Sequence, residues 1–322
     1  MNFNLAQHPV TRDFMFLTKY TTPHGTEHET FSKLLTTRGF KLDGAGNYFG
    51  SIGDSDTLFI AHMDTADRER VRVRREVRGS IVATDGKTIL GADDKAGCAV
   101  LLHLWRNKVP GNYLFVVGEE RGMVGSTAFN RNLSPYMFMR AVAWDRFGYE
   151  SIITHQMGER GCSDAFANAL AEQFSALGLP MQLDPGGSYT DTYAVFQNIP
   201  ECTNLSVGYF SQHTTSEVQD VEHLVRMAEA SVYIEWETLP VVQDLHDRDE
   251  WSTKGVRTPK GSWNSWVWEG DTYVADPAGI ADELVLQAQY GTLRFSDVED
   301  FVVNYPEEAG PLLYDLLTRG GL

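Results

Sequence analysis

Several short apolar runs in this chain end directly in residues with polar or charged side chains. Leu58–Ala61 precedes His62, Ala141–Trp144 precedes Asp145, and Tyr113–Val117 precedes a glycine and two glutamates. An uninterrupted apolar run of this length is typical of a strand buried on both faces of a sheet. Helical patterns separate the runs up to about residue 240, and this alternation predicts an α/β fold with a mostly parallel central sheet.

The composition of the chain changes after Pro240. Residues 251–268 hold four of the seven tryptophans and are locally basic, and short helical patterns follow them. We therefore predict a main domain over residues 1–243, with three α/β/α layers, and a small, mainly helical appendage over residues 244–322. The tryptophans of the appendage form either a local core or a lid or partner surface.

The charge of the chain excludes some classes of function. Its 322 residues carry a formal net charge of -17, with a sequence pI of about 4.9. Nucleic-acid binding needs a basic surface, and an acidic chain gains nothing from an anionic membrane. Three cysteines without CxxC spacing indicate reduced thiols, and no apolar run is long enough to span a bilayer. We predict a cytoplasmic protein that binds neither nucleic acid nor membrane.

Metal-ligand residue types stand where the carboxyl ends of these strands would meet. Parallel strands present such residues to one shared crevice. Zinc binds imidazole nitrogen and carboxylate oxygen, and two ions can share one carboxylate and activate water for hydrolysis. We expect Asp93 to bridge two divalent ions, His62 and Asp145 to bind one ion, and Glu120 and His213 to bind the other. The mixed ligands favour zinc, although cobalt or manganese could replace it.

Two further acidic residues accompany the predicted ligands. Asp64 lies two residues after His62, so in a strand both side chains face one side, and its carboxylate can accept the imidazole N–H. Glu119 precedes the ligand Glu120 and is not needed to bind metal. A carboxylate beside the activated water suits a general base that later returns the proton to the leaving amine. We therefore predict catalytic roles for Glu119 and Asp64.

The order of these motifs resembles that of a known superfamily. HMD, GADDKAG, GEE, WD and the late histidine of HTTSE are similar to the co-catalytic dinuclear zinc exopeptidases, which include peptidase T-like, carboxypeptidase G-like and single-domain leucine aminopeptidase-like enzymes. Residues 17–53 are similar to the opening helix of that superfamily, its Pro-x-Gly-x-Glu turn and its Gly-Asn strand entry. The resemblance covers roughly residues 15–240.

The resemblance implies the same ligands and the same base as the residues themselves suggest. It also implies a cis peptide bond after Asp93. Asp191, in GGSYTDTYAV, is similar to a segment near the active site of some members, and Glu217 lies four residues after His213. Both are expected behind the ligands or beside the substrate pocket.

One departure from the superfamily concerns its inserted lid or dimerisation domain. Only 31 positions separate His62 from Asp93, and 68 separate Asp145 from His213. Neither interval can hold a domain of roughly a hundred residues. We therefore expect no inserted lid, a catalytic unit like that of the single-domain aminopeptidases, and no lid-borne recognition of a substrate carboxylate.

The sequence leaves three functions open. The first is a zinc-dependent exopeptidase, in particular an aminopeptidase that cleaves short peptides through a metal-bridging water activated by Glu119. The second is a metal-dependent deacylase or amidohydrolase acting on a non-peptide amide, because the same ligands serve both. The third, a non-catalytic binding protein on the same fold, is disfavoured because every expected ligand type is present. The expected partners are a peptide or small amide and further copies of the chain, as a homo-oligomer.

Several polar residues receive structural assignments instead. Asp94 is expected to cap a helix rather than to bind metal. His103 falls within an apolar helical run and is expected in the core. Five further histidines are expected on the surface: His8, His24, His28, His223 and His246.

Overall fold

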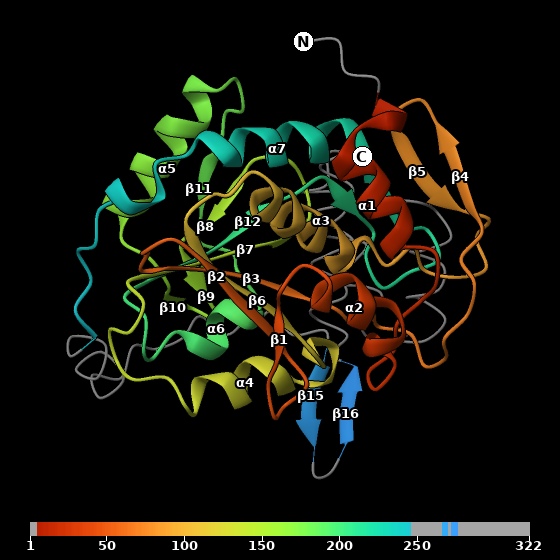
Figure 1. The fold of residues 1–322 in the computed structure, drawn as a ribbon, viewed down its shortest axis with the longest axis horizontal. Helices are drawn as coiled ribbons and strands as arrows, with labels where there is room; N and C mark the ends of the chain where they lie inside the picture. The colour runs from red at the N-terminus through yellow and green to blue at the C-terminus, as the bar shows by residue number, and fades with distance from the viewer. Residues whose placement is uncertain (1–4, 246–265, 270–271, 276–322) are drawn as a thin grey trace, which may run out of the picture. The chain divides into compact units, whose positions relative to one another are not determined.

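The computed structural model describes residues 5–245, 266–269 and 272–275 (Figure 1). Its largest sheet has eight strands in the order β1-β2-β6-β3-β7-β12-β8-β11. The strands are β1 (Lys41–Leu42), β2 (Tyr48–Ile52), β3 (Thr57–His62), β6 (Gly111–Val116), β7 (Arg140–Arg146), β8 (Ser151–Ile153), β11 (Gln182–Asp184) and β12 (Glu201–Ser206). The central strands β6, β3, β7 and β12 are parallel, while β1, β2 and β8 join them through antiparallel pairings. The predicted mostly parallel central sheet is confirmed.

Strand β3 shows why the sheet needs a layer of helices on each face. Leu58 and Ile60 belong to one apolar cluster, and Phe59 and Ala61 belong to another. Because successive side chains of a strand point to opposite faces, the two clusters lie on opposite sides of the sheet. One face is covered by α1 (Pro9–Leu17), α3 (Ala92–Arg106) and α7 (Val221–Tyr233), and the other by α4 (Val124–Asn130) and α6 (Asp191–Val195) (Figure 1). This is the predicted three-layer α/β/α arrangement.

The described residues form seven α-helices and three short 3-10 turns. The α-helices are α1 (Pro9–Leu17), α2 (Glu27–Thr36), α3 (Ala92–Arg106), α4 (Val124–Asn130), α5 (Asp164–Ala176), α6 (Asp191–Val195) and α7 (Val221–Tyr233). Short 3-10 turns are η1 (Leu5–Gln7), η2 (Glu119–Arg121) and η3 (Trp236–Thr238). None of the helices within these described ranges is long and apolar enough to cross a membrane.

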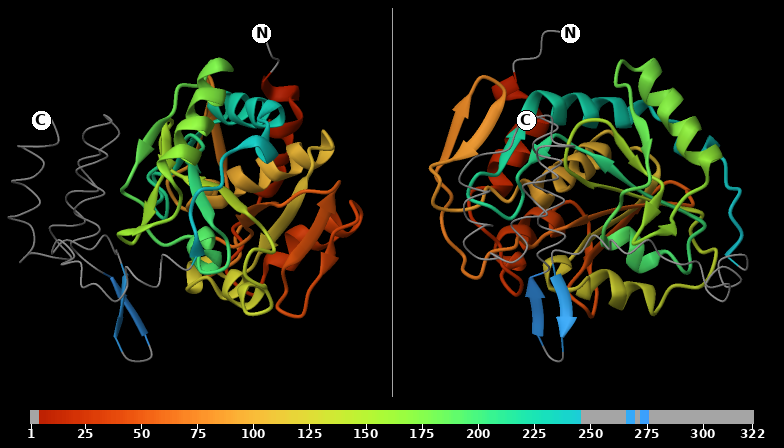
Figure 2. Two further views of the ribbon diagram at one scale, coloured as in Figure 1. Left: turned by 90° about the vertical axis from the view of Figure 1, so that its left-hand side faces the viewer. Right: turned by 180° about the vertical axis from the view of Figure 1, so that it is seen from behind.

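A second, antiparallel sheet lies beside the first. Its strand order is β13-β14-β5-β4, formed by β4 (Arg75–Arg78), β5 (Ile81–Thr84), β13 (Tyr209–Phe210) and β14 (Val218–Asp220). Hairpin β4–β5 is drawn in orange in Figure 1 and in the right-hand view of Figure 2. This hairpin is the only helix or strand structure between His62 and α3. The interval between Asp145 and His213 contains β8 to β13 together with α5 and α6. A small hairpin of β9 (His155–Gln156) and β10 (Glu159–Arg160) lies there too. As predicted, neither interval holds an inserted domain.

Two of the histidines predicted to lie on the surface are largely buried. His103 is buried, as expected, and His24 and His28 are exposed. His223 was expected on the surface but is only 8% exposed, because its ring packs edge-on against Tyr149 with the ring centroids 4.8 Å apart. Burial lowers the pKa of His223 to about 4, so this side chain is neutral at neutral pH. His8 was also expected on the surface, but only 9% of its side chain is exposed. His246 lies outside the described residues.

The predicted appendage is described only in part. Strands β15 (Trp266–Glu269) and β16 (Thr272–Ala275) pair antiparallel as a hairpin. The helical patterns expected after them lie outside the described residues. The division of the chain into residues 1–243 and 244–322 stays a prediction.

Candidate metal centre

The strand register places the predicted ligands at one edge of the central sheet. His62 is the last residue of β3 and pairs with Val116 at the end of β6, which leads into Glu119 and Glu120. Ile60 pairs with Ala143 on β7, so Asp145 stands level with His62. The parallel strands therefore carry these side chains to the same end of the sheet, as expected for a crevice at their carboxyl ends.

Asp93 reaches the same place from the first turn of α3 and stands between the two histidines. One carboxylate oxygen, Oδ1, is 2.9 Å from Nε2 of His62. The other, Oδ2, is 3.1 Å from Nε2 of His213, which lies in the loop between β13 and β14. A carboxylate with one histidine at each oxygen has the arrangement needed to bridge two cations. The peptide bond after Asp93 is cis, which the resemblance predicted.

The two remaining predicted ligands each approach one histidine. Oδ1 of Asp145 is 3.6 Å from Nε2 of His62, and Oε1 of Glu120 is 3.1 Å from Nε2 of His213. Asp145 thus lies beside His62 and Glu120 beside His213, with Asp93 between the two histidines. The assignment of these five residues as metal ligands stays a prediction.

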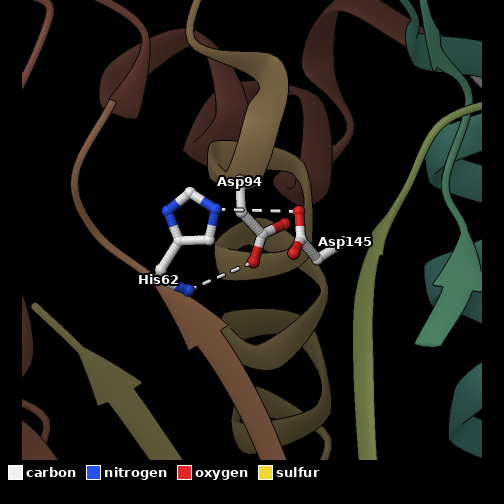
Figure 3. Close-up of side chains that lie close together, drawn as sticks. All are labelled: His62, Asp94 and Asp145. Carbon is white, nitrogen blue, oxygen red and sulfur yellow. Dashed lines mark hydrogen bonds and ion pairs between the residues drawn. The ribbon is translucent and has the colours of Figure 1, made fainter. Parts of the chain in front are cut away.

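Asp94 lies closer to this cluster than the sequence suggested. Ligand atoms of His62, Asp94 and Asp145 lie within 4.8 Å of one another (Figure 3). The same holds for ligand atoms of His62, Asp93 and Glu120. Nevertheless, both Asp94 oxygens accept hydrogen bonds from the backbone. Oδ1 accepts from the N–H of Gly97 at 2.9 Å, as a helix cap does, and Oδ2 accepts from the N–H of His62 at 3.2 Å. This agrees with the capping function expected for Asp94 and adds a contact to β3.

The carboxylates of the cluster make positive charge favourable at this place. Burial opposes protonation of His62 and His213, yet contacts with Asp145, Asp93 and Glu120 raise the pKa of both imidazoles well above the usual value. Burial would raise the pKa of Asp93, but hydrogen bonds from the two imidazoles hold it well below its ordinary range. Such a site attracts either protons on its histidines or metal ions that displace them.

One buried oxygen of Glu120 shows whether the residues of the cluster fit a metal ion. Its Oε1 atom is buried and accepts no hydrogen bond, although Nε2 of His213 is 3.1 Å away. A buried carboxylate oxygen without a hydrogen-bond partner is unfavourable unless a cation neutralises it. The residues present therefore fit two divalent ions held by mixed imidazole and carboxylate ligands.

Asp64 holds the backbone of both glutamates, a contact that the sequence did not suggest. Its Oδ1 accepts the N–H of Glu119 at 3.0 Å, and its Oδ2 accepts the N–H of Glu120 at 3.2 Å. The predicted contact with His62 is longer, because Nδ1 is 3.5 Å from Oδ1 of Asp64 and 3.2 Å from its backbone carbonyl. Asp64 therefore links the end of β3 to the turn that carries both glutamates.

Replacing Asp64 with asparagine should lower activity by about 10- to 100-fold. One amide N–H would then face a backbone N–H, so the turn carrying Glu119 and Glu120 would lose one of its two anchors. The measurement is kcat/KM for a cleaved substrate. Asp220→Asn is the matched control, because Oδ1 of Asp220 also accepts two backbone N–H groups, at the start of α7, without contacting the cluster. Equal activity in Asp64→Asn and the control would contradict this function of Asp64.

Glu119 precedes Glu120 in the same turn, and among the described residues it belongs to neither group of ligand atoms that lie within 4.8 Å of one another. Burial, together with repulsion from Asp191 and Glu120, raises the pKa of Glu119 well above that of an ordinary glutamate. Asp191, which the resemblance placed near the site, is buried and accepts a hydrogen bond from the hydroxyl of Ser126 at 2.6 Å. Burial also raises the pKa of Asp191 to about 7.

Three residues that sequence reasoning missed surround Asp145. Thr190 donates from its hydroxyl to Oδ2 at 3.0 Å, and the buried Tyr209 hydroxyl donates to Oδ1 at 3.1 Å. The Asn204 side chain accepts the N–H of Asp145 at 2.7 Å and donates to its carbonyl at 2.6 Å. Thr190 precedes Asp191 in a segment that the sequence did single out, whereas nothing in the sequence pattern marked Tyr209 or Asn204.

The comparisons with known proteins agree with this fold. No protein-family model matches the chain. An uncharacterized protein of Bacillus subtilis strain 168, YqjE, is 37% identical over 101 residues, which are 28% of this chain and only 27% of YqjE. The match therefore spans about a quarter of that relative.

Solved structures match over more of the chain. Aminopeptidase PepT of Bacillus cereus ATCC 10987 has a TM-score of 0.61 at 18% identity, and a tripeptidase of Staphylococcus aureus has 0.58 at 17%; each match covers 70% of this chain and 96% of the other. The TET1 peptidase of Pyrococcus horikoshii has a TM-score of 0.52 at 14% identity, covering 69% and 98%. These likenesses show that the chain shares the fold of these peptidases, as the resemblance implied.

Proposed function

We propose that this chain is a metal-dependent exopeptidase that cleaves short peptides, and in particular an aminopeptidase. The observation that carries the proposal is the position of Asp93, with one oxygen at His62 and the other at His213. Asp145 and Glu120 complete the two halves of the site. Two divalent ions, most simply zinc, would polarise the scissile carbonyl and make a water acidic enough to attack it.

The protein residues would divide the remaining tasks between binding and proton transfer. His62, Asp145, Glu120 and His213 would hold the metals, with Asp93 shared. Glu119 would take the proton from the attacking water and deliver it to the departing nitrogen. Partial removal from water raises the pKa of its carboxyl, which makes it a stronger proton acceptor than an exposed glutamate.

The preference for an aminopeptidase comes from what surrounds the site. Among the described residues no inserted domain offers groups to bind a substrate carboxylate. PepT and the staphylococcal tripeptidase, whose names describe an aminopeptidase and a tripeptidase, share the fold. Self-association is also proposed, since TET1 assembles into a tetrahedron or a large octahedral shell. Zinc as the native metal and a cytoplasmic location stay predictions.

Metal analysis together with hydrolysis of a peptide pool tests the proposal. We expect about two zinc ions per chain by elemental analysis, and chelator-sensitive release of N-terminal residues from mixed di- and tripeptides. The same peptides with acetylated N-termini should resist cleavage, because an aminopeptidase requires a free α-amine. Cleavage of only the acetylated set would favour the deacylase alternative, and protein that takes up no metal would contradict both enzymes.

A further inference from the structure

The carboxylate of Glu217 is enclosed by four consecutive backbone N–H groups. Oε2 accepts from Leu90 and Gly91, each at 2.7 Å, and Oε1 accepts from Ala92 at 2.7 Å and from Asp93 at 3.1 Å. The side chain is 1% exposed, so these donors replace the water that an exposed glutamate would contact. Hydrogen bonds from several N–H groups to a buried carboxylate are among the stronger contacts a protein makes.

The backbone of this segment is shaped to receive an anion. Gly91 has φ +70°, and a Cβ there would lie 2.8 Å from Cγ2 of Thr65, so both conformation and space favour glycine. Successive N–H groups around a left-handed residue point inward and form an anion-binding concavity. The first N–H groups of a helix have no acceptor within the helix. In α3, Oε1 of Glu217 is the acceptor for the N–H groups of Ala92 and Asp93.

The loop that carries Glu217 also carries His213. His213 contacts the side chain of Asp93, with Nε2 3.1 Å from Oδ2, while Glu217 accepts the backbone N–H of the same residue. The loop is fixed internally by a hydrogen bond from the N–H of Glu217 to the carbonyl of Thr214 at 3.2 Å. Asp93 is therefore held at its backbone and at its carboxylate by one short segment.

We propose that Glu217 is a positioning residue that sets where Asp93 stands between the two histidines, and that it thereby determines how tightly the site binds metal. The proposal rests on the metal centre proposed above. Glu217 does not itself reach a ligand position, because both of its oxygens are occupied by backbone N–H groups. Because Asp93 is shared, misplacing it weakens the binding of both ions.

Glu217→Gln is the informative variant, and Glu201→Gln is its matched control. An amide keeps the shape of the side chain but turns an N–H toward the donors of the loop. Glu201 is equally buried and accepts the N–H groups of Ser163, Val242 and Gln243 at 2.6 to 3.1 Å. It lies at the first residue of β12, at the opposite end of the sheet from the site, so its loss affects stability alone.

The readouts are the affinity for Zn²⁺ from chelator competition and the visible absorption of Co²⁺-loaded protein, together with the Tm of the metal-free protein. Glu217→Gln should bind Zn²⁺ about 10- to 100-fold more weakly and shift the Co²⁺ bands. Glu201→Gln should lower the Tm while keeping wild-type affinity and spectrum. Glu217→Asp keeps the charge on a shorter side chain, so its affinity for Zn²⁺ should lie between those of wild type and Glu217→Gln. If Glu217→Gln does not fold, Glu217→Asp alone provides the test.

Two results would overturn the inference, and they differ from each other. Wild-type affinity and an unchanged Co²⁺ spectrum in the Glu217 variants, with only the Tm lowered, would reduce Glu217 to a structural residue. Wild-type protein that takes up neither Zn²⁺ nor Co²⁺ would overturn the metal centre itself, and this inference with it.

Discussion

Replacing Glu119 with glutamine is expected to lower kcat for peptide cleavage by about 10²- to 10⁴-fold while leaving metal content unchanged. Glutamine has nearly the same shape but cannot accept a proton. The backbone N–H of residue 119 would still donate to Asp64, so the turn should keep its conformation. The measurement is kcat on a cleaved dipeptide together with elemental analysis of the same preparation.

The neighbouring residue provides the control for this prediction. Oε1 of Glu120 lies 3.1 Å from Nε2 of His213, so Glu120→Gln should lower metal content as well as activity. The two adjacent substitutions separate proton transfer from metal binding. If Glu119→Gln kept near-normal kcat, or lost metal as Glu120→Gln does, the assignment of Glu119 as the base would be wrong.

Removing the metals is expected to lower the free energy of unfolding by about 4 kcal/mol per ion, when free metal was present at about 1,000 times its Kd. Ligands that bind only the folded chain stabilise it by mass action. The physical source here is the cluster of buried Asp93 with half-buried Glu120 and Asp145, whose negative charges metals would neutralise. Urea unfolding at one pH, with and without chelator, measures the effect.

Asp93→Asn serves as the control for chelation. Without the bridging carboxylate this variant should bind metal poorly, so chelator should change its stability little. Wild-type protein with the same unfolding midpoint in both conditions would contradict the metal centre. A loss of equal size in wild type and in Asp93→Asn would show that the chelator acts elsewhere.

Most of the fold could be predicted because its signals are local. Apolar runs such as Leu58–Ala61 can be stable only when both faces are covered, so a buried parallel strand follows from the run alone. His62 and Asp145 directly follow such runs, and strand ends are where a sheet presents polar groups. The burial of His223 does not follow from the sequence. A histidine among apolar residues of a helix gives the same pattern whether or not another segment packs against that face of α7.

The contacts that surround the predicted ligands could not be predicted in the same way. Tyr209 and Asn204 meet Asp145 across 64 and 59 positions of sequence, and Glu217 meets the loop before Asp93 across about 125. No spacing rule connects residues so far apart. Asp64 was expected to serve His62, and only the register of β3 with β6 showed that its carboxylate reaches the N–H groups of Glu119 and Glu120.

The sequence by itself determined the types of side chain available, the strands and helices that carry them, and hence the fold class and the candidate ligands. These follow from hydrophobic period and from chemistry that a residue has wherever it lies. The tertiary structure decided which oxygen of Asp93 faces which histidine, and which groups hold Asp64, Asp145 and Glu217. Those contacts depend on strand order and loop packing, which place distant segments within hydrogen-bond distance of each other.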